Sequence, residues 1–93
     1  ETMRECMEDL PKLQARLKRI EGQIRGISDM MEKDVPCNEI LIQIHAAKSA
    51  LHKVGQMVVE GHLHHCVKDS IEHGNTEETL KDLSKVIEYF SRI

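Results

Sequence analysis

The stretch from Cys37 to Cys66 constrains this chain more than any other part of its sequence. No proline falls between the two cysteines, and apolar residues recur there at helical spacing. This pattern predicts one long helix that continues to about Ile71. A thiol stands at its beginning. His62 and Cys66 stand one turn apart near its end, where a spacing of four puts them on one helical face.

The length of this helix decides how the three side chains can meet. With a rise of about 1.5 Å per residue, Cys37 lies about 38 Å from His62 along the axis. The ligands of one metal ion must lie within about 2.3 Å of it. The three groups therefore cannot bind one ion within a single chain. They can meet when two copies of the helix pack antiparallel, so a site made from them would be shared between subunits.

A heptad-like seam precedes this stretch and predicts a first helix. The helix is expected to begin after Asp9, which can cap it, and to end before Pro36. Its apolar residues recur at alternating steps of three and four, which is typical of a helix that packs along one stripe. The seam consists of Leu10, Leu13, Leu17, Ile20, Ile24, Ile27 and Met31.

A third, shorter helix is predicted from Thr76 to about Arg92. Gly74 suits the left-handed position that ends a helix, and Asn75 followed by Glu78 resembles a capping box for the next one. The sequence thus predicts an all-α fold, in which the protomer has two long antiparallel helices and a short C-terminal helix. Residues 1–8 are expected to form a flexible tail and residues 9–93 a single helical domain.

The composition favours assembly of several chains. The sequence has 93 residues with one Tyr, one Phe and no Trp, so its core must be aliphatic and small. Three helices of this kind cannot bury all their apolar stripes alone. The pairing of two helical hairpins into a four-helix-bundle dimer is the arrangement that we expect.

Charge and cysteine usage narrow the class of protein. The net charge is −3, yet residues 12–25 hold five basic residues and one acidic residue, a local face that could bind a polyanion. No apolar run approaches 18 residues and no signal-peptide pattern is present, which predicts a cytoplasmic protein without a membrane partner. The third cysteine, Cys6, is interpreted as an exposed thiol, with an auxiliary ligand or an oxidation site as the alternative. The sequence contains no phosphate-binding loop and no paired carboxylates of the kind that would indicate an enzyme.

Two thiolates and one imidazole form a soft donor set, which favours Cu(I) or zinc over Mg²⁺ or Ca²⁺. Structural zinc takes four ligands, whereas Cu(I) accepts three readily. Other interpretations stay open at this point. The two cysteines can be small buried apolar groups, or Cys37 and Cys66 of opposing chains can form a redox pair. A helical bundle that buffers copper without binding DNA is a further alternative.

Three segments resemble one known family. They are residues 16–27 (RLKRIEGQIRGI), residues 42–51 (IQIHAAKSAL) and residues 65–67 (HCV). They are similar to the copper-sensitive operon repressor (CsoR/RcnR) family of metal- and persulfide-sensing transcriptional repressors, and most similar to its copper-sensing branch. The resemblance implies an all-helical dimer of dimers, a homotetramer that binds double-stranded operator DNA without a helix-turn-helix. Ligand binding on the second long helix would release the DNA.

The resemblance also implies roles for particular residues. One Cu(I) per protomer would bind Cys37 of one subunit and His62 and Cys66 of its neighbour, with no organic cofactor. Glu77 matches the family carboxylate that does not bind the metal itself but lies next to the metal ligands. The residues that match its DNA-contacting face are Arg16, Lys18, Arg19, Arg25 and Lys48.

The persulfide-sensing branch keeps the two thiols and lacks the histidine, so His62 favours copper. Pro36 stands where copper sensors usually have Tyr, and Lys48-Ser49 looks more like the persulfide branch. A persulfide-responsive repressor is therefore the alternative to a Cu(I)-responsive one.

Overall fold

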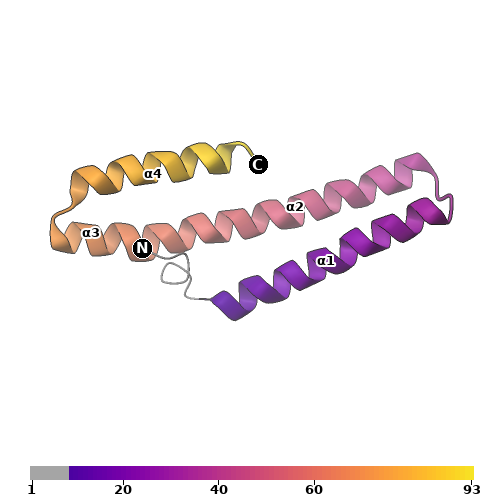
Figure 1. Ribbon diagram of the computed structural model, residues 1–93, viewed down its shortest axis with the longest axis horizontal. Helices are drawn as coiled ribbons and strands as arrows, with labels where there is room; N and C mark the ends of the chain where they lie inside the picture. The colour runs from indigo at the N-terminus through magenta and orange to yellow at the C-terminus, as the bar shows by residue number, and fades with distance from the viewer. Residues whose placement is uncertain (1–8) are drawn as a thin grey trace. The chain divides into compact units, whose positions relative to one another are not determined.

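The computed structural model describes residues 9–93, apart from the side chain of Cys66, and within that range it is helical without strands. Its elements are α1 (Leu10–Glu32), α2 (Cys37–His62), a π-helical turn η1 (Leu63–Val67), α3 (Lys68–His73) and α4 (Thr76–Ser91) (Figure 1). Because α2, η1 and α3 follow one another without a loop, the described part of the chain has three helical segments. This confirms the all-α, three-helix protomer. The predicted tail and Cys6 lie outside the described residues.

The turn between α1 and α2 is built on a left-handed residue. Asp34 has φ +57°, and the N–H of Val35 donates to the carbonyl of Met30 at 3.1 Å. This hydrogen bond closes the last turn of α1 in the way typical of helix C-termini. Pro36 follows, and its carbonyl accepts from the N–H of Ile40 at 3.2 Å. The proline thus starts α2, so that Cys37 becomes the first residue of that helix.

Residues 11–54 form one compact unit, an antiparallel hairpin of α1 and the first part of α2 (Figure 1). Its buried side chains are Leu13, Ile20, Ala47 and Val54, each at most 9% exposed. The seam of α1 is therefore divided between two environments. One row packs within the hairpin, whereas the row formed by Leu17, Ile24 and Met31 stays exposed.

Residues 55–93 belong to the second unit, in which α4 folds back along η1 and α3 (Figure 1). Gly74 adopts the predicted left-handed conformation with φ +81°, and the N–H of Asn75 donates to the carbonyl of Ser70 at 3.2 Å. The side chain of Asn75 forms no cap, so the expected capping box was wrong. Its carbonyl is used instead, since the hydroxyls of Ser70 and Thr79 both donate to it at 2.8 Å.

The end of α4 packs closely on α2 at Gly55. A Cβ built at this glycine would lie 2.6 Å from Cδ1 of Ile93 and 3.6 Å from the ring of Phe90. The absence of a side chain therefore lets the two helices approach at this level.

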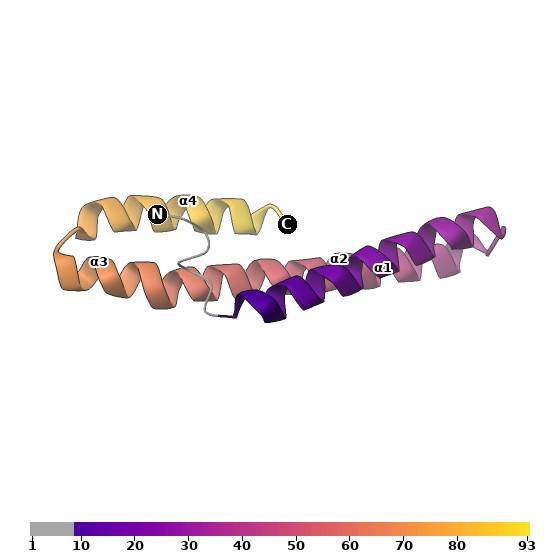
Figure 2. The ribbon, with the colours of Figure 1, turned by 60° about the horizontal axis from the view of Figure 1, so that its bottom comes forward.

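The second long helix differs from the sequence prediction in one respect. An unbroken α-helix to about Ile71 was expected, but the π-helical turn η1 interrupts it after His62. The backbone nevertheless stays helical on both sides, with φ/ψ of −62°/−44° at His62 and −60°/−46° at Lys68. The ribbon accordingly runs from α2 into α3 without reversing direction (Figure 2). Residues 63–67 contain no glycine or proline, so no local signal separates a π-helical turn from an α-helical one.

Candidate functional site

Cys37 is the first residue of α2, where Pro36 sets the start of the helix. Its thiol is free and exposed. A side chain in this position is accessible to a group from outside its own chain. This is what a ligand shared between subunits requires.

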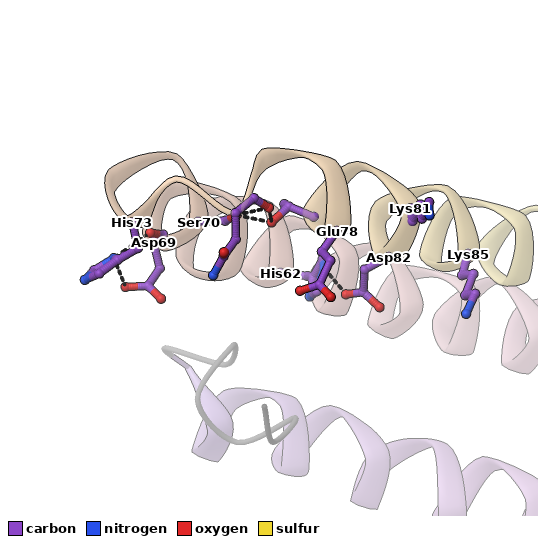
Figure 3. Close-up of a pocket in the computed structure, with 10 residues that line it drawn as sticks. His62, Asp69, Ser70, His73, Glu78, Lys81, Asp82 and Lys85 are labelled. Carbon is purple, nitrogen blue, oxygen red and sulfur yellow. Dashed lines mark hydrogen bonds and ion pairs between the residues drawn. The ribbon is translucent and has the colours of Figure 1, made fainter.

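His62 is the last residue of α2, and its side chain is largely buried at 12% exposure. Its Nε2 lies 3.4 Å from Oδ2 of Asp82 on α4, whose own side chain is 57% exposed (Figure 3). The carboxylate oxygen thus faces Nε2 and can accept a hydrogen bond from a proton on that nitrogen. A carboxylate behind a histidine in this way is the usual means by which proteins orient a metal-binding imidazole.

Cys66 lies within η1, four residues after His62. Among the described residues, no group of three His, Cys, Asp or Glu side chains lies close enough together to hold a metal ion. The three predicted ligands are thus distributed along the helix, with Cys37 and His62 at opposite ends of α2.

Asp82 is a residue that the sequence analysis missed. The expected supporting carboxylate was Glu77, which lies exposed in the first turn of α4. The structure places Asp82 against His62.

A cleft of about 440 Å³ extends from His62 along α3 and α4. Its walls are polar, and Figure 3 shows His62, Asp69, His73, Glu78 and Asp82 along it. At its far end Nδ1–H of His73 donates to the carbonyl of Asp69 at 2.8 Å. This hydrogen bond, together with the nearby carboxylate of Asp69, raises the pKa of His73 above its ordinary value.

The five basic residues assigned to DNA all belong to the hairpin. Arg16 is half-buried, whereas Lys18, Arg19 and Arg25 on α1 and Lys48 on α2 are exposed. The guanidinium of Arg25 lies 2.6 Å from the carboxylate of Glu21, one turn earlier. Both side chains are well exposed, so water and salt weaken this ion pair.

Comparison with known proteins places this chain among regulators. Residues 9–89 match the family model described as metal-sensitive transcriptional repressor. The copper-sensing transcriptional repressor CsoR of Bacillus subtilis is 46% identical over 77 residues, which cover 83% of this chain and 76% of that protein. The copper-sensing transcriptional repressor RicR of Mycobacterium tuberculosis is 46% identical over 59 residues, covering 63% of this chain and 62% of that protein.

Solved structures agree with this placement. The copper-sensing repressor CsoR with Cu(I) from Geobacillus thermodenitrificans superposes with a TM-score of 0.83 at 43% identity, covering 90% of this chain and 88% of that one. The nickel-responsive transcriptional regulator InrS superposes with a TM-score of 0.85 at 38% identity, covering 90% and 94%. In the described part of the present chain, no helix is long and apolar enough to cross a membrane. The chain belongs to the family of metal-sensitive transcriptional repressors.

Proposed function

We propose that this protein is a Cu(I)-responsive repressor that binds operator DNA without metal and is released when Cu(I) binds between subunits. The observation that carries the proposal is the placement of His62. Its largely buried imidazole is held by Asp82 on one side and is followed one turn later by Cys66. The similarity to copper-sensing repressors supports the choice of metal.

The donor set fits Cu(I) better than harder cations. Cys37 of one protomer and Cys66 of its neighbour would supply thiolates, and His62 of that neighbour would supply Nδ1, because its Nε2 faces Asp82. Soft ligands of this kind select Cu(I), and a three-ligand set suits it. When bound, Cu(I) would link two subunits at this place, with one ion per protomer.

Two exposed apolar stripes support a dimer. On α1, Leu17, Ile24 and Met31 are spaced by seven and are 44–57% exposed. On α2, Ile44 and Leu51 are 40% and 50% exposed, and they continue the stripe that begins at Cys37. A second hairpin laid against both stripes would complete a four-helix bundle. Two such dimers would then form the homotetramer.

The basic residues of the hairpin would bind the duplex through its phosphates. The described helices hold one aromatic pair, Tyr89 and Phe90, and it lies on α4 rather than among these basic residues, so base stacking is not expected to contribute. Binding should therefore weaken steeply as salt rises. To release DNA, the metal must bind the non-binding conformation more tightly, and such coupling is typically about 1–3 kcal/mol.

The deciding experiment is an anaerobic titration of the reduced protein on its operator, with Cu(I) in one arm and inorganic polysulfide in the other. We expect release at one Cu(I) per chain, lost in His62→Ala, while His64→Ala serves as a matched control because that residue is exposed. An Asp82→Asn variant should still bind one Cu(I) per chain, but about 10- to 100-fold more weakly. Loss of a hydrogen-bonding partner that orients a metal ligand usually has an effect of this size.

The thiol of Cys37 is free and exposed, which also suits a persulfide-responsive repressor. Release by polysulfide alone, with a Cys37–Cys66 crosslink between chains and no effect of His62→Ala, would establish that function instead. A substitution such as Arg19→Ala distinguishes either kind of repressor, Cu(I)-responsive or persulfide-responsive, from a helical bundle that only buffers copper. Only a repressor should lose DNA affinity in that variant.

A further inference from the structure

Two hydroxyl groups join α4 to the helical segment that precedes it, and the proposed function has given them no role. The hydroxyl of Thr79 on α4 is hydrogen-bonded to that of Ser70 on α3, and the Ser70 hydroxyl also donates to the carbonyl of Asn75 at 2.8 Å. Ser70 is only 8% exposed, so its contacts are shielded from water. We call Ser70 and Thr79 the hydroxyl pair.

The remaining contacts of α4 restrict its position less strictly. No side chain of α4, all of whose residues the structure describes, is buried, and its least exposed apolar residues, Leu83, Val86 and Phe90, are half-buried. Apolar contacts are non-directional, so a helix that is held mainly by them can rotate or slide. A hydrogen bond weakens steeply with distance and angle. The hydroxyl pair therefore restricts the rotation of α4 about its own axis.

The hydroxyl pair lies one helical turn from the carboxylate that contacts His62. Thr79 and Asp82 are three positions apart on α4, which places them on the same face of the helix. Oδ2 of Asp82 lies 3.4 Å from Nε2 of His62, which is already long for a hydrogen bond (Figure 3). A further lengthening of about 0.2 Å would end this interaction. A small rotation of α4 is therefore enough to separate Asp82 from His62.

We propose that Ser70 and Thr79 are positioning residues for the metal site. Their hydrogen bond holds α4 at the rotation at which Asp82 reaches His62, and Asp82 in turn orients the imidazole for Cu(I). Because His62 is taken as a ligand, this assignment rests on the proposed function. The effect of the hydroxyl pair on the metal is transmitted by Asp82.

Thr79→Val tests this assignment, because valine keeps the shape of threonine and removes its hydroxyl. Thr79→Ser keeps the hydroxyl and is the conservative variant, whereas Ser84→Ala is a matched control at an exposed position on α4. In the metal-free protein, the nuclear Overhauser contact between the His62 ring and the Asp82 side chain should weaken in Thr79→Val and persist in Thr79→Ser. This measurement needs no metal.

The second measurement is Cu(I) affinity, determined by competition with a chromogenic chelator. Thr79→Val should bind Cu(I) about three- to tenfold more weakly, a part of the about 10- to 100-fold loss expected when Asp82 itself is replaced. Thr79→Ser and Ser84→Ala should match the parent. In an Asp82→Asn background, Thr79→Val should weaken binding by less than about twofold further, because residues that act through one contact are not additive.

A Thr79→Val variant that binds Cu(I) as the parent does, or whose loss multiplies with that of Asp82→Asn, overturns the inference. Ser70→Ala breaks the same hydrogen bond and decides the question if Thr79→Val does not fold. Failure of both variants to fold overturns the inference, because the hydroxyl pair is then required for the fold itself. A parent protein that takes up no Cu(I) overturns the proposed function. The positioning role is then decided by the metal-free contact, whose persistence in Thr79→Val overturns it.

Discussion

The hairpin of residues 11–54 and the unit of residues 55–93 are stabilised by different interactions. The hairpin buries four aliphatic side chains, and the ionic groups assigned to function lie mostly on its surface. In the second unit the buried residue with a polar side chain is Ser70, which joins Thr79 and Asn75, while His62 pairs with Asp82. Apolar packing depends on shape alone, whereas a polar network depends also on protonation, ligands and register. The stability of the second unit is therefore the one that depends on polar contacts as well as on apolar packing.

The largest effect expected from this difference is on the hairpin core. Ile20→Ala removes a side chain that is 5% exposed and should lower the free energy of unfolding by about 2–4 kcal/mol. Ile24→Ala is the matched control, because Ile24 is 57% exposed in the protomer. Urea unfolding at several protein concentrations measures both.

The two isoleucine variants should behave differently with concentration. If the exposed stripe packs against a second chain, Ile24→Ala raises the concentration needed for assembly, whereas Ile20→Ala destabilises the protein at every concentration. Equal losses in both variants, independent of concentration, would contradict the division of the α1 seam into an inner and an outer row.

A smaller effect is expected in the polar network. Ser70→Ala removes the hydroxyl that donates to Asn75, while Thr79 still donates to the same carbonyl. The loss should be about 1–2 kcal/mol and confined to the second unit. Hydrogen exchange should show faster opening of α4 amides with unchanged protection of α1. Ser84→Ala, at an exposed position on α4, should have little effect.

The two helix-ending turns offer a third comparison, because both contain a left-handed residue. Gly74 has φ +81°, which glycine adopts easily, but Asp34 has φ +57° and carries a side chain. Asp34→Gly should therefore raise the free energy of unfolding by about 0.5 kcal/mol, whereas Gly74→Ala should lower it by about 1 kcal/mol. Thermal unfolding of the pair measures both, and a shift of the same sign in both variants would show that the backbone conformation is not the cause.

Strong local signals made the fold predictable from sequence. Pro36 marks the boundary between the two long helices, and Gly74 marks the start of the return to α4, because each restricts the backbone by itself. The heptad spacing likewise identified the residues of the α1 seam, of which Leu13 and Ile20 are buried.

What could not be predicted depends on contacts between segments. Asp82 lies beside His62, which follows from how α4 lies against the preceding helix and not from any spacing within α4. The turn η1 was missed for the same reason, since residues 63–67 are compatible with an α-helix. His62 and Ser70 both contact α4, and only the tertiary arrangement reveals these contacts.

The smallest expected effect concerns pH at the far end of the cleft. The hydrogen bond to the carbonyl of Asp69, and then the charge of its carboxylate, raise the pKa of His73 in the folded protein. A histidine whose pKa is raised by folding stabilises the protein below its unfolded pKa, near 6.5, and this contribution disappears as pH rises through the folded value. An NMR titration should place the midpoint of His73 above the ordinary histidine value of 6.5. In Asp69→Asn the midpoint should fall only partway, because the backbone carbonyl remains. A complete return to the ordinary value would show that the carboxylate alone is responsible, and would make the second unit sensitive to salt at this point.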